Sequence, residues 1–142
     1  MLLRILGGVI LLAVLVIAYI AWTLRPLDAG AVQSEWMTDA DRFVTVDGED
    51  WRVRETGPDD GPALVLIHGF SHSLESWEDL AAELDDQYRI IRFDLPGHGL
   101  TGPRADKAYS VSETVDQVSA LLDEIAPAQF SIGGNSLGGL VA

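Results

Sequence analysis

The chain of 142 residues contains no cysteine and only one lysine, Lys107. Without cysteine it can form no disulfide, bind no metal through thiolates and use no thiol nucleophile. Basic residues are scarce as a class, because nine Lys and Arg stand against 22 Asp and Glu. Residues 28–142 hold all 22 acids and seven of the nine bases, so this part carries a formal charge of −15. Such a charge repels nucleic acid, and we expect no nucleic-acid partner.

Charge is also missing from residues 5–24, "ILGGVILLAVLVIAYIAWTL", which are flanked by Arg4 and Arg25. Twenty helical residues span roughly 30 Å, about the hydrocarbon thickness of a bilayer. Aromatic residues near the far end of the run suit a membrane interface. The run therefore predicts an N-terminal membrane anchor over residues 1–25.

Two alternatives to an uncleaved anchor are a cleaved signal peptide and a buried core helix. A signal peptide has a shorter apolar region of roughly 7 to 15 residues, although residues 29–31, Ala-Gly-Ala, offer a small-residue cleavage site. Arg4 and the terminal amine favour an N-terminus inside the cell, whereas Arg25 opposes it weakly, since acidic residues follow. We expect a single-pass membrane protein whose globular part lies outside the cytoplasm.

Residues 26–40 are predicted as a polar linker, and the rest of the chain, residues 41–142, as one domain. Residues 42–48 and 51–57 alternate apolar and polar side chains around Asp47-Gly48, which predicts a β-hairpin. The remaining segments are predicted, in chain order, as strand 63–69, helix 74–86, strand 88–94, helix 111–126, strand 128–134, and a helix that begins at Ser136. The apolar face of helix 74–86 is expected to hold Leu74, Trp77, Leu80, Ala81 and Leu84. A capping box at Ser110 and Glu113 is predicted to open helix 111–126.

This alternation predicts the α/β class, with a mostly parallel sheet and helices on its faces. In such sheets ligands bind at the carboxyl ends of the strands. The residues at those ends are His68-Gly69, Asp94-Leu95 and Gly134-Asn135. Chemistry is therefore expected at this edge of the sheet.

Residues 97–102 match G-x-G-x-x-G, the pattern of a dinucleotide-binding loop. That function requires a helix whose N-terminus meets the pyrophosphate. Pro103 and polar residues follow instead, and no predicted helix begins for roughly eight residues. We predict a tight structural loop here, and no cofactor or metal for the chain.

Residues 134–138, Gly-Asn-Ser-Leu-Gly, match G-x-S-x-G between a predicted strand and a predicted helix. A sharp turn of this kind strains the serine backbone and exposes its hydroxyl, and it needs small residues at Gly134 and Gly138. The N–H after the serine then faces a developing oxyanion at the helix N-terminus. A glycine-rich helix start without chemical purpose is the alternative.

The segments "LVLIHGF", "SWEDLAAEL", "RIIRFDLPGHGLTG" and "FSIGGNSLGG" follow the order seen in α/β-hydrolase fold enzymes, and residues 40–142 resemble the N-terminal half of that fold. The resemblance implies that Ser136 is the nucleophile and that the N–H groups of Phe70 and Leu137 form the oxyanion hole. It also implies that Asp94 and "PGHG" form a structural loop near the pocket. A serine at this turn argues against the haloalkane dehalogenases and epoxide hydrolases of this fold, which use aspartate there.

In this family the acid and histidine of the triad follow the nucleophile, yet only six residues follow Ser136. We expect His68 to hold its loop by hydrogen bonds, which leaves His72 and His98 as candidate bases within the chain. The resemblance implies a membrane-anchored serine hydrolase of ester-like small molecules, here a fragment that is inactive alone. The alternatives are a non-catalytic binding module, a cofactor-free oxidase and an acyltransferase on the same fold.

Overall fold

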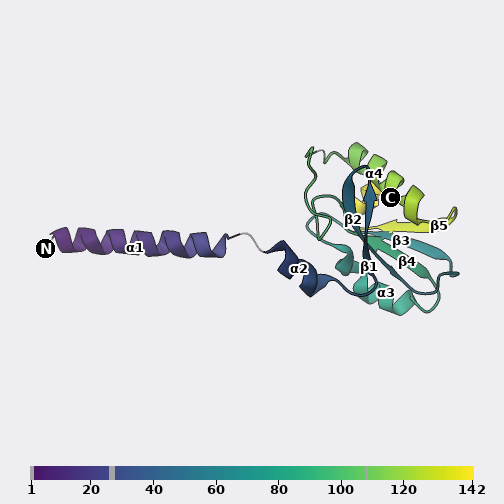
Figure 1. Ribbon diagram of the computed structural model, residues 1–142, viewed down its shortest axis with the longest axis horizontal. Coiled ribbons are helices and arrows are strands. Elements are labelled where there is room, and N and C mark those ends of the chain that lie inside the picture. Colours follow the sequence, from purple (N-terminus) through teal and green to yellow (C-terminus); the bar gives the residue numbers. More distant parts are fainter. Residues whose placement is uncertain (1, 26–27, 108) are drawn as a thin grey trace. The chain divides into compact units, whose positions relative to one another are not determined.

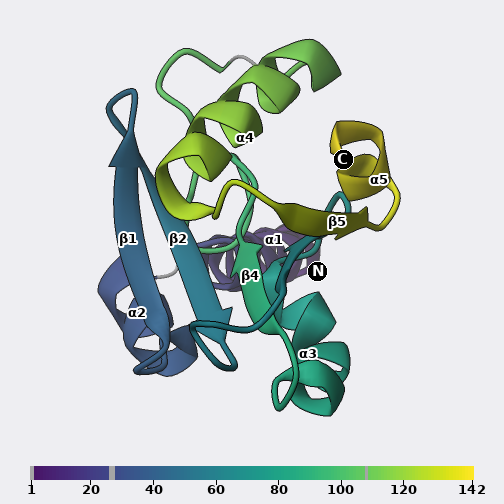
Figure 2. The ribbon, with the colours of Figure 1, turned by 90° about the vertical axis from the view of Figure 1, so that its right-hand side faces the viewer.

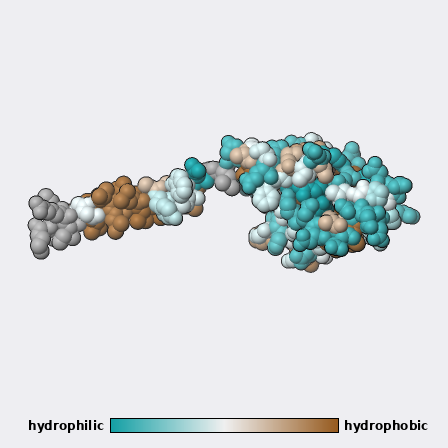
Figure 3. Space-filling model, turned by 90° about the horizontal axis from the view of Figure 1, so that it is seen from below, coloured by the Kyte–Doolittle hydropathy of each residue, from teal (hydrophilic) through white to brown (hydrophobic). Residues whose placement is uncertain are grey.

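The computed structural model describes residues 2–25, 28–107 and 109–142, and its two compact units are Met1–Trp36 and Met37–Ala142. The first unit holds helices α1 (Leu2–Thr23) and α2 (Ala29–Trp36). Figure 3 shows apolar surface along α1, whereas most of the surface that this view shows for the second unit is hydrophilic.

Helix α1 confirms the predicted N-terminal apolar helix. Its segment Leu6–Thr23 has a mean hydropathy of 2.4, and none of it is buried, so it is long and apolar enough to cross a membrane. A signal sequence near the N-terminus has the same properties. Helix α2 lies within the segment predicted as a polar linker, and the small residues 29–31 form its first turn.

The second unit contains a five-stranded sheet of order β1-β2-β4-β3-β5 (Figure 1). Its strands are β1 (Asp41–Val46), β2 (Glu49–Thr56), β3 (Ala63–Ile67), β4 (Arg89–Phe93) and β5 (Phe130–Gly134). The hairpin β1–β2 forms as predicted, and β2 also pairs antiparallel with β4, whereas β3 pairs parallel with β4 and β5. The predicted α/β class is confirmed, and the sheet is a mixed one.

Helices cover both faces of this sheet. The remaining elements are the 3₁₀ turn η1 (Leu74–Trp77), α3 (Glu78–Leu84), α4 (Val111–Ile125) and α5 (Leu137–Val141). Figure 2 shows α4 and α5 on one side of the strands and α3 on the other. The predicted capping box opens α4, because the Ser110 hydroxyl accepts from the Glu113 N–H while the Glu113 carboxylate accepts from the Ser110 N–H.

The helix predicted over residues 74–86 was wrong in one respect, because it begins as the 3₁₀ turn η1. A 3₁₀ turn has fewer residues per turn than an α-helix, so it rotates the helical face that follows. Leu74 and Ala81 are buried as expected, but Leu80, predicted on the apolar face, is 41% exposed. The carboxylate of Asp94 fixes the start of η1 by accepting a hydrogen bond from the Leu74 N–H at 2.8 Å.

The main apolar core lies between the sheet and α4. Residues from β3 and β4 such as Ile67 and Phe93 pack there against Val118 and Leu121 of α4. The run of β3 is buried on both faces, as its continuous apolar sequence predicts. This rigid centre fixes the carboxyl ends of β3, β4 and β5, from which the candidate site is built.

Candidate functional site

The turn between β5 and α5 holds Ser136 in an unusual backbone conformation. Its φ is 52° and its ψ is −112°, a region that non-glycine residues rarely adopt. The serine side chain is exposed, and it immediately precedes the first residue of α5. The strained, exposed serine that the G-x-S-x-G pattern predicts is therefore present in the fold.

The two glycines of the pattern leave no room for a side chain. A Cβ on Gly134 would lie 2.2 Å from the carbonyl oxygen of Gly138, and a Cβ on Gly138 would lie 2.2 Å from the carbonyl oxygen of Ile67. A Cβ on Gly139 would have more room, because it would lie 3.2 Å from the carbonyl oxygen of Gly134. Gly133 would meet nothing closer than a Leu66 methyl at 3.5 Å, an ordinary contact. Steric exclusion thus explains Gly134 and Gly138, as predicted.

The loop after β3 lies directly against this turn. The Asn135 N–H donates a hydrogen bond to the Ile67 carbonyl at 3.1 Å. A Cβ on Gly69 would lie 3.1 Å from the Asn135 carbonyl oxygen and 3.3 Å from the Ser136 Cβ. The backbone that leads to Phe70 therefore lies beside the serine, as the predicted oxyanion loop requires.

Two backbone N–H groups near Ser136 remain available to a ligand. In residues 2–25, 28–107 and 109–142, neither the Phe70 N–H nor the Leu137 N–H donates a backbone hydrogen bond. Leu137 is the first residue of α5, where N–H groups lack intrahelical acceptors. These are the two donors that the sequence predicts for an oxyanion hole, and their catalytic role stays a prediction.

His68 is a structural residue of this site. Its side chain is fully buried, with Nε2 accepting a hydrogen bond from the Leu95 N–H at 2.9 Å and Nδ1 lying 2.8 Å from the Gly69 carbonyl oxygen. Because Nε2 accepts, the proton must lie on Nδ1 and the ring must be neutral. Burial lowers the pKa of the His68 imidazole, which agrees with this state. Its predicted role of holding the loop is confirmed.

The other two histidines also brace loops. The Nδ1 atoms of His72 and His98 lie 2.9 Å from the Phe70 carbonyl oxygen and 3.1 Å from the Pro96 carbonyl oxygen. The His98 ring also meets the rings of His68 and Phe70 edge-on, with centroids 5.3 and 5.5 Å apart. Among the described residues neither His72 nor His98 makes a hydrogen bond to Ser136.

The loop over residues 97–102 is organised by the buried carboxylate of Asp94. The Leu100 N–H donates to Asp94 Oδ2 at 2.8 Å. Gly99 has a φ of 48°, and a Cβ there would lie 2.1 Å from the same oxygen, so only glycine fits. The loop therefore wraps a carboxylate and opens no helix, as expected of a structural loop.

Sequence reasoning missed a layer of buried arginines on the α3 side of the sheet. Arg52 of β2 joins Asp41 at 3.2 Å and Asp94 at 3.4 Å, while Arg54 joins Asp41 at 2.7 Å. Burial alone would raise the pKa of Asp41, but hydrogen bonds from Arg54, the Thr38 N–H and Arg52 lower it to about 2. The available signal was the spacing of Arg52 and Arg54, which places both on one face of a strand.

A cavity of about 510 Å³ adjoins the turn. Two of its lining residues, Phe70 and Leu137, carry the predicted oxyanion donors. The other lining residues come from the loops after β3 and β4 and from the start of α4: Ser71, Leu95, Pro96, Gly97, His98, Pro103, Tyr109 and Thr114. This size and concave form are typical of small-molecule sites.

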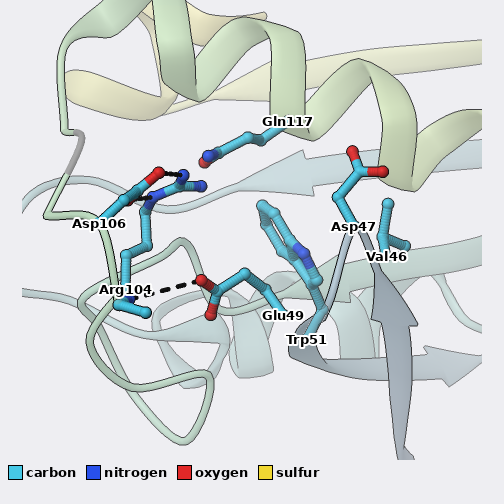
Figure 4. A pocket seen from close by; sticks show the side chains of 8 residues that line it. Val46, Asp47, Glu49, Trp51, Arg104, Asp106 and Gln117 are labelled. Carbon is cyan, nitrogen blue, oxygen red and sulfur yellow. Dashed lines mark hydrogen bonds and ion pairs between the residues drawn. The ribbon is translucent and has the colours of Figure 1, made fainter.

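A smaller hollow of about 220 Å³ lies at the β1–β2 turn (Figure 4). Three of its charged groups are engaged within the chain, since Arg104 pairs with Asp106 and the Glu49 carboxylate accepts from the Ala105 N–H. None of the predicted site residues lines this hollow. The cavity beside Ser136 is therefore the better candidate for chemistry.

Comparisons with known families and structures place this geometry among hydrolases. A family model described as the alpha/beta hydrolase fold matches residues 62–142. A crystal structure of a membrane phospholipase A, a bacterial virulence factor, is 30% identical with a TM-score of 0.69, covering 100% of this chain and 46% of that one. A hydrolase from Pseudomonas aeruginosa PA01 is 28% identical with a TM-score of 0.65, covering 74% of this chain and 40% of that one.

Curated proteins give similar matches. The magnesium-chelatase 30 kDa subunit of Rhodobacter capsulatus is 34% identical over 93 residues, 66% of this chain and 33% of that protein. The putative 2-succinyl-6-hydroxy-2,4-cyclohexadiene-1-carboxylate synthase of Bacillus subtilis (strain 168) is 36% identical over 101 residues, 70% of this chain and 36% of that protein. The chain thus spans about a third of the length of these curated relatives.

Proposed function

The chain belongs to the α/β-hydrolase fold family, and from this premise we propose that it carries the nucleophile of a membrane-anchored serine hydrolase that acts on ester-like small molecules. The observation that supports this most directly is the backbone of Ser136, held at φ 52° between β5 and α5. Strain of this kind is concentrated at active sites, where the surrounding structure has to enforce it. The strained, exposed hydroxyl is suited to nucleophilic attack.

The proposed chemistry is acyl transfer. The Ser136 Oγ attacks the ester carbonyl, and the oxyanion that forms accepts hydrogen bonds from the Phe70 and Leu137 N–H groups. The alcohol then leaves with a proton, and water hydrolyses the acyl-serine to release the acid. Removing one oxyanion donor typically costs about 10²- to 10³-fold in kcat, so this pair supplies a large part of the expected rate.

The proton from Ser136 needs a base within hydrogen-bond reach. His68 cannot supply it, because the ring is buried and both nitrogens are engaged. His72 and His98 each brace a loop through Nδ1. We therefore propose that the 142-residue chain alone has no esterase activity. Release of p-nitrophenol from short-chain nitrophenyl esters, abolished by Ser136→Ala, would contradict this.

Helix α1 supports the proposal of membrane attachment. Its apolar segment Leu6–Thr23 is wholly exposed, so within its own unit nothing shields it from water. Burying such a surface in a bilayer recovers the hydrophobic free energy. We propose that α1 is an uncleaved anchor and that the hydrolase unit lies outside the cytoplasm.

The experiment that tests the hydrolase proposal is labelling with a fluorophosphonate probe. Membranes are taken from cells that express the full-length product of the gene, and not the 142-residue chain alone, for which we propose no activity. The labelled residue is mapped by mass spectrometry. We expect an adduct on Ser136 and none in a Ser136→Ala strain, with Ser131→Ala of β5 as the matched control that keeps labelling. No adduct on properly inserted protein would refute the proposal.

The same experiment decides the rival function, a non-catalytic binding module on this fold. The observation that favours it is that both ring nitrogens of His68, and the Nδ1 atoms of His72 and His98, already have partners within the chain. If the chain is a binding module, the protein should be stable and correctly inserted, and Ser136 should stay unlabelled at every probe concentration.

A further inference from the structure

The cavity beside Ser136 has a largely apolar wall, although the chain as a whole carries a net charge of −13. Within the described residues, its lining includes no Asp, Glu, Arg or Lys. The apolar contributors are Phe70, Leu95, Pro96, Pro103 and Leu137. Away from the N–H pair, a bound carboxylate or phosphate would therefore meet no Lys or Arg.

Three polar side chains of the wall, those of Thr114, Tyr109 and His98, already have partners within the chain. The Thr114 hydroxyl donates to the Ser110 carbonyl at 3.0 Å, and the Tyr109 hydroxyl oxygen accepts from the Arg104 N–H at 2.8 Å. His98 Nδ1 lies 3.1 Å from the Pro96 carbonyl oxygen. A polar ligand group would have to compete for these partners, whereas a hydrocarbon would leave them intact.

From this lining we propose the substrate class of the site, an inference that rests on the proposed function: the cavity binds the apolar acyl chain of an uncharged ester and discriminates against acyl groups that carry a carboxylate. Phe70 and Leu137 connect the cavity to the proposed oxyanion hole, because each of them lines the cavity and also has a free backbone N–H. The ester carbonyl would then lie at the N–H pair while the chain fills the 510 Å³ beyond it.

The cavity volume limits the acyl chain. With roughly 30 Å³ for each methylene-sized group and about half of the volume filled, the limit lies near roughly eight carbons. Below that limit each added methylene should raise affinity about fourfold. Beyond it the gain should stop, because further carbons remain in water.

Binding of straight-chain alcohols tests this without any serine chemistry. The full chain is placed in lipid nanodiscs, dialysis fixes the free ligand concentration, and methyl NMR follows Leu95 and Leu137. From 1-butanol through 1-hexanol to 1-octanol we expect affinity to rise about 15-fold per two carbons, and then to level off at 1-decanol. 8-Hydroxyoctanoate, which carries a carboxylate at the far end of the same chain, should bind at least tenfold more weakly than 1-octanol. Affinity that ignores chain length, or 8-hydroxyoctanoate binding as tightly as 1-octanol, would overturn the inference.

A charge placed in the wall gives the matched comparison. Ser71 is exposed and lines the cavity, so Ser71→Lys adds a cation there at small cost to the fold. Ser119 is exposed on α4 and does not line the cavity, so Ser119→Lys makes the same change in net charge elsewhere. We expect Ser71→Lys to raise the ratio of the 8-hydroxyoctanoate affinity to the 1-octanol affinity at least fivefold and Ser119→Lys to leave it unchanged. Equal ratios in both variants would count against the inference.

Failure of the inference and failure of the proposed function give different results. Ser136→Ala should bind the alcohols like the unmodified chain, since the hydroxyl is not part of the wall. Absent fluorophosphonate labelling with retained alcohol binding would refute the hydrolase proposal, and with it the assignment of the cavity to a substrate. Labelling without chain-length-dependent binding would refute the substrate class alone.

Discussion

Replacing Gly138 by alanine tests how closely the turn at Ser136 is packed. The added methyl would lie 2.2 Å from the Ile67 carbonyl oxygen and 2.6 Å from the His68 carbonyl oxygen, both of them backbone atoms of the loop and strand beneath. Carbon and oxygen atoms approach no closer than about 3.2–3.5 Å without strain, so the backbone must move by roughly 1 Å. Overpacking of a rigid interior costs typically about 1–3 kcal/mol of stability. Because the neighbours here are backbone atoms, which cannot rotate away as a side chain can, we expect a cost at or above the upper end of this range.

The measurement is thermal unfolding of the full chain in a mild detergent, followed by near-ultraviolet circular dichroism. About 3 kcal/mol corresponds to a Tm lower by roughly 12–24 °C for a domain of this size. Gly133→Ala is the matched control, because its methyl would meet only Leu66 at 3.5 Å. It should be neutral or stabilise by about 0.4–1 kcal/mol. Gly138→Ala melting within 2 °C of the unmodified chain would refute the described contact between turn and loop.

Three further predictions concern the same unit and the anchor. His68→Phe keeps a planar aromatic ring, although a larger one, and leaves the buried Leu95 N–H without an acceptor. The free energy of unfolding should fall by about 1–3 kcal/mol, and an unchanged Tm would contradict this role. The pKa of Asp41 is lowered from 3.8 to about 2, so its contribution is present above pH 3.8 and is lost as pH falls towards 2. The lowered pKa corresponds to roughly 2 kcal/mol of stability, and Asp41→Asn should flatten this part of the Tm–pH curve. After extraction of membranes with alkaline carbonate, the chain should stay in the membrane pellet. Its N-terminus, determined by mass spectrometry, should be residue 1 or 2, whereas an N-terminus just after residues 29–31 would show signal cleavage.

The sequence predicts the parts of the fold that depend on local pattern. Alternation around Asp47-Gly48 gives the hairpin, and the Ser110–Glu113 spacing gives the capping box of α4. The size limit on Gly134 is equally local, because a Cβ there would meet the carbonyl oxygen of Gly138 within the same turn. Each of these features can therefore be read from a short window of residues.

Features that depend on distant partners were not predictable in this way. Asp94 accepts from the N–H groups of both Leu74 and Leu100, and the first of these bonds fixes the 3₁₀ turn that moves Leu80 to the surface. The arginine layer has the same origin, since the partners of Arg52 come from three separate segments of the chain. A hydropathy pattern carries no information about such pairings, because it records the polarity of a residue and not its partner.

The contacts around Ser136 supply the geometry of a nucleophile, but they do not by themselves activate its hydroxyl. Strain at Ser136, exclusion at Gly138 and the close approach of Gly69 are all properties of the backbone, and the fold enforces them whether or not a base is present. Activation requires an imidazole with a free nitrogen directed at the hydroxyl. Both ring nitrogens of His68 are instead hydrogen-bonded to the backbone of Gly69 and Leu95, which fixes the loop that positions Phe70. In the proposed mechanism, His68 would therefore act by positioning the Phe70 N–H group and not by proton transfer. A variant such as His68→Phe should therefore affect probe labelling of Ser136 and thermal stability together, whereas loss of a true base would lower labelling and leave the Tm unchanged.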